Sequence, residues 1–375
     1  MTPEQNEMMT RVGPGTPGGE FLRRYWWPVW FSQELTNKPV QVRLLGENFV
    51  LFRDGSGKAG FLDLHCPHRR ASLALGRVED KGIRCCYHGW LLSAEGRCLE
   101  MPAEPPGSRL HEDVRQRAGL TQEVAGLIFA YLGPLPAPQL PRYDLLARTD
   151  CDRTVWAAED FCNWAQRAEN GVDSFHSMAL HASVYPTMAM KRPEVTWNKM
   201  WYGFRMQSEY PGGHRNVSHH IFPSSTRRHG ARVGTTPSEF LHIRVPTDDI
   251  TTTTFYVKAN VKEQGPYEIK CRGMKKTVPG VYDRVEDGWW GLKSSEQDRA
   301  AQESQGAIHD RSKEFLATSD RGVAMWRKTL LDSIEAVQNG EDPYGIVRDA
   351  SKQDIVHFDA GKNFSDQDKV LGSVA

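Results

Sequence analysis

Residues 66–90 read CPHRRASLALGRVEDKGIRCCYHGW and combine cysteines and histidines in two mixed pairs. Cys66 and His68 form the first pair, Cys85 and His88 form the second, and sixteen residues separate the pairs. Thiolates and imidazoles bind soft and borderline metals, so two such pairs predict a metal centre. Zinc is the alternative, although zinc fingers usually pair Cys with Cys and His with His. Mixed pairs favour a [2Fe–2S] cluster with two thiolates on one iron and two imidazoles on the other.

A second group of potential ligands follows about a hundred residues later, in the sequence DSFHSMALH from Asp173 to His181. On a helix or bent helix, His176 and His181 stand about one turn apart and can share a metal. Alone, such a pair is weak evidence for a metal site, but its position about a hundred residues after the first motif strengthens that interpretation. A carboxylate would be needed as a third ligand, because two histidines and one carboxylate on one face form a recurring metal site with open coordination positions. The candidate carboxylates farther along the chain are Glu296, Asp298, Glu303, Asp310 and Asp320.

The rest of the chain predicts an α+β protein. Short β-branched and aromatic runs extend from Val40 to Leu132, and strand-like runs return between Val195 and Val261. Between these regions, Leu132–Asp144 contains four prolines, which argues for a domain boundary. We expect helices over residues 20–27, 159–180, 294–307 and 322–339. The predicted organisation is an N-terminal helical segment (1–40), a cluster domain (41–140), a catalytic domain (141–345) and a polar tail that wraps the surface (346–375).

Composition narrows the class of protein. The chain has 375 residues, and 47 basic residues balance 47 acidic ones, which argues against a nucleic-acid-binding protein. The longest strongly apolar stretch is too short for a membrane helix of about 20 residues. Seven cysteines, an odd number, fit a reduced cytoplasm better than a disulfide framework. We therefore expect a cytoplasmic enzyme with no membrane or nucleic-acid partner.

The sequence resembles the Rieske non-haem iron oxygenases in four segments. These are the two metal motifs, the N-terminal RVGPGTPGGEFLRRYWWPV and the C-terminal SEQDRAAQESQGAIHDRSKEF. The resemblance is to oxygenase (alpha) components of the phthalate-dioxygenase-like and aromatic O-demethylase-like subgroup. It implies that Cys66 and Cys85 bind one iron of a Rieske cluster, and that His68 and His88 bind the other. The family's second pair is Cys-x2-His, which selects Cys85 rather than its neighbour Cys86. At Arg70 the family commonly has glycine.

The resemblance also implies the fold and the second centre. The expected fold is an N-terminal Rieske [2Fe–2S] β domain followed by an antiparallel-sheet catalytic domain covered by helices. Asp298, which precedes the run AAQES, would join His176 and His181 as the third iron ligand. Asp173 lies on the same helical face as His176 and can hydrogen-bond to it. In the family, this aspartate connects that histidine to a Rieske histidine, here His88, of a neighbouring subunit, which implies a homotrimer.

The implied function is that of a terminal oxygenase component. The sequence shows no dinucleotide or flavin motif, so electrons must come from a separate reductase or a ferredoxin. With O₂, the enzyme would hydroxylate or O-demethylate a small aromatic, foremost an aromatic acid. The alternatives are a ring-dihydroxylating dioxygenase of the same family, a Rieske electron-transfer protein and a zinc-binding interaction protein. A substrate carboxylate would pair with an arginine, for which the candidates are Arg205, Arg227, Arg228 and Arg244.

Overall fold

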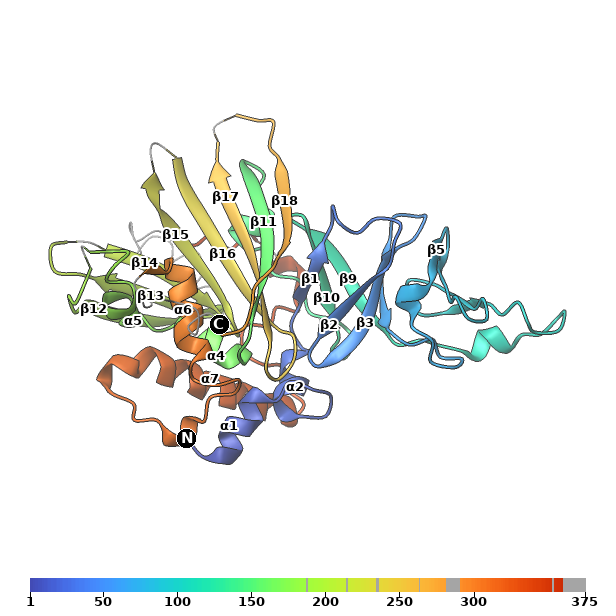
Figure 1. Cartoon of the computed structure of the whole chain (residues 1–375), viewed down its shortest axis with the longest axis horizontal. Helices are drawn as coiled ribbons and strands as arrows, with labels where there is room; N and C mark the ends of the chain where they lie inside the picture. Colours follow the sequence, from blue (N-terminus) through green and yellow to red (C-terminus); the bar gives the residue numbers. More distant parts are fainter. Residues whose placement is uncertain are drawn as a thin grey trace.

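The computed structural model describes residues 1–186, 188–213, 215–233, 236–262, 264–280, 291–352 and 354–359. The molecule is elongated, with a β-rich lobe at one end and a large twisted sheet with helices at the other (Figure 1). The expected α+β fold, a Rieske β domain followed by a sheet-rich domain with helices, is confirmed. The predicted domain boundaries stay a prediction.

The smaller lobe contains two antiparallel sheets. The larger has the order β1-β10-β9-β4-β3-β2 and consists of β1 (Trp27–Phe31), β2 (Val40–Leu44), β3 (Glu47–Arg53), β4 (Ala59–Asp63), β9 (Ala118–Val124) and β10 (Leu127–Tyr131). The smaller has the order β5-β6-β7-β8 and consists of β5 (Arg77–Glu79), β6 (Gly82–Arg84), β7 (Leu91–Leu92) and β8 (Cys98–Glu100). Both cysteine–histidine pairs lie in the loops around this second sheet, at the far end of the molecule (Figure 1).

The larger lobe is built on an eight-stranded sheet of order β12-β13-β14-β15-β16-β17-β11-β18. Its pairs are antiparallel except for β11 with β18, which run parallel. The strands are β11 (Cys151–Asp160), β12 (Glu194–Met200), β13 (Gly203–Glu209), β14 (Arg215–Ile221), β15 (Ser225–Val233), β16 (Thr236–Pro246), β17 (Thr252–Val261) and β18 (Ile269–Lys275). The sheet thus contains the strand-like runs predicted between Val195 and Val261.

Helices lie against this sheet and below it (Figure 1). They are α1 (Pro3–Thr10), α2 (Pro17–Leu22), α3 (Asp144–Ala147), α4 (Trp164–Asn170), α5 (His176–Leu180), α6 (Ser294–Glu303) and α7 (Arg321–Gln338). The long α7 matches the predicted helix over 322–339, and Gly340 follows with φ of 82°, the left-handed conformation typical of a helix end. No helix in the described part of the chain is both long and apolar enough to cross a membrane.

Three local predictions were wrong. The helix expected over residues 20–27 is α2, which ends at Leu22, and the aromatic run from Trp27 forms β1 because it pairs with β10. The region 159–180 is not one helix but the end of β11 followed by α4 and α5. The described part of the tail does not only wrap the surface. Phe358 and Asp359 are buried, and Asp359 pairs with Arg205 of β13, while residues 360–375 lie outside the described residues.

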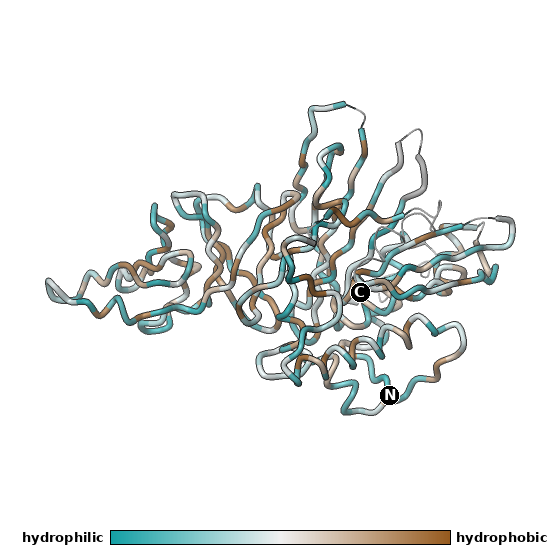
Figure 2. Tube along the Cα trace, turned by 180° about the vertical axis from the view of Figure 1, so that it is seen from behind, coloured by the Kyte–Doolittle hydropathy of each residue, from teal (hydrophilic) through white to brown (hydrophobic). Residues whose placement is uncertain are grey.

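The described residues form two hydrophobic cores. One joins the six-stranded and eight-stranded sheets, where the rings of Phe31 and Phe255 lie 5.6 Å apart. The other lies in the far end of the smaller lobe and includes Phe52, Cys66 and Cys85. Hydrophobic stretches follow the strands, whereas hydrophilic stretches mark the outer loops (Figure 2). The cluster motif therefore has its own core, separate from that of the larger lobe.

Candidate metal centres

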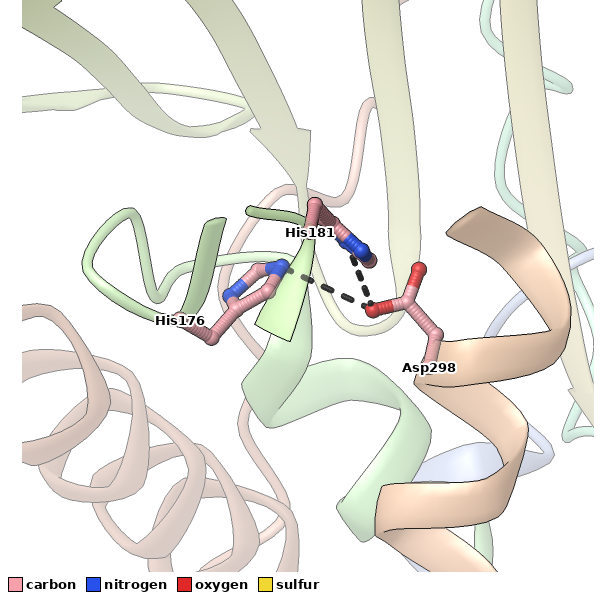
Figure 3. Close-up of side chains that lie close together, drawn as sticks. All are labelled: His176, His181 and Asp298. Carbon is pink, nitrogen blue, oxygen red and sulfur yellow. Dashed lines mark ion pairs between the residues drawn. The ribbon is translucent and has the colours of Figure 1, made fainter. Parts of the chain in front are cut away.

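His176, His181 and Asp298 come together in the larger lobe (Figure 3). His176 starts α5, His181 follows its end, and Asp298 projects from α6. Oδ1 of Asp298 lies 3.6 Å from Nε2 of His176 and 3.3 Å from Nε2 of His181. Adjacent ligands around an octahedral ion stand about 3 Å apart, so this triad fits one metal ion on one face. His176, His181 and Asp298 thus form a 2-His-1-carboxylate arrangement.

The charges of the triad residues would stabilise a bound cation. Burial raises the pKa of Asp298, but its contacts with His181 and His176 outweigh burial and hold the pKa well below the usual value. Burial lowers the pKa of His176, yet the neighbouring Asp173 and Asp298 raise it overall. The site is therefore anionic at neutral pH whenever the two imidazoles are neutral, and a divalent cation would compensate this charge.

Two amides support the triad, and sequence reasoning missed both. Asn170, at the end of α4, donates from Nδ2 to Oδ1 of Asp298 at 3.1 Å. Gln297 lies directly before Asp298 and is fully buried, and its Oε1 lies 2.9 Å from Nδ1 of His181. Neither amide is part of a recognisable metal-ligand motif. Only their position in the sequence, close to the candidate ligands, could have suggested a role at the site.

Asp173 lies where it was predicted, beside His176. Its Oδ2 is 3.3 Å from Nδ1 of His176, on the side of the ring opposite the triad, and the side chain is 25% exposed. Burial raises the pKa of Asp173, but the contacts with His176 and the backbone lower it overall, so this carboxyl is ionised at neutral pH. Asp173 therefore contacts a triad histidine and is also partly exposed.

The remaining carboxylate candidates point elsewhere. Asp310 is partly exposed and contacts Ser312 and Lys313 rather than the adjacent Arg311. Asp320 accepts a hydrogen bond from the backbone of Ala317, and Glu296 accepts one from that of Lys293. Glu303 is buried and contacts Arg299. Within the described residues, Asp298 is the candidate that joins the two histidines.

The four predicted cluster ligands divide into an inner and an outer pair. Cys66 and Cys85 are 1% and 3% exposed, whereas His68 is exposed and His88 half-buried. The imidazole centroids of His68 and His88 lie 4.4 Å apart. Burial raises the pKa of the Cys66 thiol to about 11, so a metal is needed to hold it as a thiolate at neutral pH. The arrangement fits a cluster with one buried and one exposed iron.

This geometry argues against a single zinc ion. Among the residues that the structure describes, the triad is the group whose three ligand atoms converge within 4.8 Å of one another. The two cysteine–histidine pairs do not converge in this way, as expected if two irons and two sulfides separate the thiolates from the imidazoles.

Two positions of the cluster motif, Cys86 and Arg70, can be compared with these expectations. Cys86 is exposed while Cys85 is buried, so Cys85 is the thiol that faces the inner core. Arg70 has φ of 61°, in the left-handed region that glycine adopts without strain. The loop thus keeps a glycine-like conformation at Arg70 in spite of the side chain.

Comparisons with known proteins agree with both centres. Residues 25–123 match the model of the Rieske [2Fe-2S] domain. The chain is 34% identical over 364 residues to the 5,5'-dehydrodivanillate O-demethylase oxygenase subunit of Sphingobium sp. strain SYK-6, covering 93% of this chain and 84% of the relative. It is 31% identical over 407 residues to the phthalate 4,5-dioxygenase oxygenase subunit of Pseudomonas putida, covering 96% and 92% of the two chains.

Solved structures show the same fold. A variant of NdmA from Pseudomonas putida CBB5, determined with caffeine, superposes with a TM-score of 0.70 over 86% of this chain and 94% of that one, at 23% identity. The match to the Rieske domain and the similarity along most of the chain lead to one conclusion. The chain belongs to the Rieske non-haem iron oxygenases, as an oxygenase subunit with a Rieske cluster and a mononuclear iron.

Proposed function

We propose that this chain is a terminal oxygenase component that hydroxylates or O-demethylates a small aromatic acid. The observation that carries the proposal is the His176, His181 and Asp298 triad in a Rieske oxygenase chain. When bound, the Rieske cluster supplies electrons and the mononuclear iron supplies O₂ activation. In O-demethylation, the aryl methyl ether, O₂, two electrons and two protons yield a phenol, formaldehyde and water. Electrons come from a separate reductase, directly or through a ferredoxin.

Each ligand has a defined role in this proposal. Cys66 and Cys85 hold the inner iron of the cluster, and His68 and His88 hold the outer one. At the second centre, His176 and His181 bind through Nε2 and Asp298 through Oδ1. Asn170 fixes the carboxylate and Gln297 fixes His181, because hydrogen bonds to ligands set their orientation.

The proposed electron path crosses between subunits. Figure 1 shows that the end of the smaller lobe, which bears the cluster ligands, lies far from α6, which bears Asp298. Asp173 contacts His176 and is partly exposed, so it can accept a hydrogen bond from His88 of a neighbouring chain. Because such a head-to-tail contact must close on itself, a homotrimer is the proposed assembly.

Names of relatives support the substrate class. One relative is an O-demethylase of a dehydrodivanillate, and another is a dioxygenase of phthalate. Both names describe aromatic acids as substrates. Methyl removal and ring hydroxylation share the same requirement for O₂ and two electrons, so the ring-dihydroxylating reaction is the second candidate.

Metal analysis tests the assignment of the centres. Wild-type protein is expected to be red-brown, with two irons and two sulfides in the cluster and one further iron. Asp298→Ala is expected to lose the further iron and all oxygenase activity, with an unchanged cluster spectrum. Asp310→Ala is the matched control and is expected to retain both. Three irons per chain and full activity in Asp298→Ala would rule out this ligand. Zinc in place of iron at the cysteine–histidine pairs would contradict their assignment as cluster ligands.

Product analysis tests the reaction. Purified oxygenase, a generic reductase and ferredoxin, and a panel of methoxylated and unmethoxylated aromatic acids are incubated under ¹⁸O₂. Formaldehyde together with a phenol indicates O-demethylation, whereas a product with two new ¹⁸O-labelled hydroxyls indicates dihydroxylation. Reduction of the cluster with no oxygenated product from any acid would favour an electron-transfer protein.

A further inference from the structure

Asp173 lies in a short turn, residues 172–175, between α4 and α5. Its Oδ1 accepts a hydrogen bond from the backbone N–H of Phe175 at 2.8 Å, while its Oδ2 lies 3.3 Å from Nδ1 of His176. Both carboxylate oxygens therefore have partners within the same few residues. The position of the carboxylate thus follows the position of the turn, and what holds the turn also holds Asp173.

One support of the turn comes from the edge of the eight-stranded sheet. The edge strand β12 carries Trp197 (Figure 1), whose indole N–H donates to the backbone carbonyl of Val172 at 3.1 Å. The Trp197 ring also lies 6.4 Å from that of Phe175. Val172 is buried, and a buried carbonyl that loses its donor is costly. The indole N–H therefore ties the residue directly before Asp173 to the sheet.

The start of α7 packs against the same hydrogen bond. Gly322 is buried, and a Cβ at this position would stand 2.3 Å from the carbonyl oxygen of Val172 and 2.3 Å from Nε1 of Trp197. Real Cβ atoms do not approach other atoms so closely, and the carbonyl belongs to the backbone. Glycine at position 322 therefore leaves the space in which Trp197 reaches Val172.

A second strand holds the residue directly after Asp173. The hydroxyl of Ser174 hydrogen-bonds to that of Ser208 in β13, and both serines are buried. Trp197 is opposite Met206 in the pairing of β12 with β13, and Met206 precedes Ser208 by two residues. Opposite residues and alternate residues along a strand point to the same side, so Trp197 and Ser208 share one face of the sheet. The turn is thus fixed to this face on both sides of Asp173.

We propose that Trp197 is a positioning residue for Asp173 and that it acts, through this turn, on electron passage between chains. The inference rests on the proposed function, whose electron path runs through Asp173. A carboxylate that must meet a group of another chain depends on its position, since a displacement of about 1 Å can cost roughly 100-fold in rate. The hydrogen bond from Trp197 goes to the backbone and not to a metal ligand, so its loss is expected to spare both metal centres.

Laser-flash photoreduction of the fully oxidised, iron-loaded protein tests this proposal without a substrate. The flash gives one electron to the cluster, and the return of the oxidised cluster spectrum measures the passage of that electron to Fe(III) at the triad. Trp197→Phe removes the N–H donor but keeps an aromatic ring, and it is expected to slow this return roughly 10-fold. Trp201→Phe, the same change in the turn after β12, is the matched control and is expected to behave as wild type.

Gly322→Ala approaches the same hydrogen bond from the other side. The added Cβ is expected to displace the Val172 carbonyl and the Trp197 indole, and so to slow the electron as well. Gly291→Ala is the matched control, because a Cβ at that position meets open space. The visible spectrum and the iron content of each variant verify that it is folded and that both centres are loaded.

A double-mutant cycle separates positioning from a general loss of stability. If Trp197 acts through Asp173, Trp197→Phe adds no further slowing to Asp173→Asn, whereas independent effects multiply. Multiplied effects overturn the proposal, as does a wild-type rate in both Trp197→Phe and Gly322→Ala.

The same measurement distinguishes this inference from the electron path on which it rests. A slow Asp173→Asn variant beside an unaffected Trp197→Phe variant would remove the role of Trp197 and keep the path. A wild-type rate in Asp173→Asn, or a wild-type protein whose cluster keeps its electron, would remove the path and the inference together. The product analysis on aromatic acids is independent of these outcomes, because the flash experiment contains no substrate.

Discussion

Nδ1 of His181 lies 2.9 Å from Oε1 of Gln297, the residue directly before Asp298 on α6. An amide oxygen only accepts, so His181 donates from Nδ1 and its Nε2 keeps the lone pair that faces Asp298. The amide nitrogen of Gln297 also donates to Oγ of Ser183, at 3.1 Å. One buried side chain therefore sets the tautomer of His181 and ties the loop after α5 to α6.

Gln297→Leu is expected to weaken iron binding at the triad roughly 10- to 100-fold, because it removes the acceptor that orients His181. The cluster spectrum is expected to stay unchanged. Iron retained after dialysis against graded chelator concentrations measures the effect. Gln305→Leu, an exposed change just beyond the same helix, serves as the control. Equal iron retention in both variants would show that Gln297 does not orient the ligand.

Cys85→Ser is expected to abolish the cluster, because Cys85 is the buried thiol of the second pair. Cys86→Ser is expected to leave the visible spectrum almost unchanged, since that side chain is exposed. Visible absorption and sulfide content of the two purified variants give the answer. A colourless Cys86→Ser protein beside a coloured Cys85→Ser protein would reverse the ligand assignment.

Asp173→Asn keeps the size of the side chain and removes its charge. Both metal centres and substrate binding are expected to remain, while electron passage from the reduced cluster to the catalytic centre slows, because the contact with His176 is weakened. Stopped-flow reoxidation of the cluster with substrate and O₂ measures this step directly. The proposed path fails if the Asn variant reoxidises at the wild-type rate, or if a monomer is fully active.

Folding stability is expected to fall as the pH drops below about 6.5. Burial lowers the pKa of His220 to about 3, and it also lowers those of His219 and His242. Between an unfolded pKa near 6.5 and the lower folded value, the unfolded chain binds a proton that the folded chain does not. The His220 contribution therefore falls by about 1.4 kcal/mol per pH unit in this range. Urea unfolding at several pH values measures the slope, which His220→Gln is expected to reduce; an unchanged slope would contradict this linkage.

Sequence reasoning identified candidate ligands where they stand close together in the chain. The two cysteine–histidine pairs and the His176 and His181 pair are local patterns that thiolate and imidazole chemistry can interpret. Asp298 required the family resemblance, because nothing in its spacing distinguished it from four other carboxylates. Its place in the triad depends on α6 packing beside α5, a tertiary contact.

The failures have one physical cause, which is dependence on distant partners. The aromatic run from Trp27 forms a strand because it pairs with β10. That pairing partner lies about a hundred residues later in the chain, so no local sequence pattern predicts it. Gln297 and Asn170 act through hydrogen bonds to residues on other elements, and amides occur throughout any sequence. Asp359 is buried because Arg205 meets it from a strand far earlier in the chain.

The separation between the cluster end and the triad has a consequence in genetic terms. If each chain passes its electrons to a neighbour, two defective alleles can complement each other within one assembly. A Cys85→Ser chain would offer an intact catalytic centre, and an Asp298→Ala chain would offer an intact cluster. Co-expressed in one cell, these two inactive proteins would regain part of the activity through mixed trimers that neither allele forms alone. Each allele expressed beside wild type would also be partly dominant, since a chain that lacks one centre leaves its neighbour without an electron donor or without an electron acceptor.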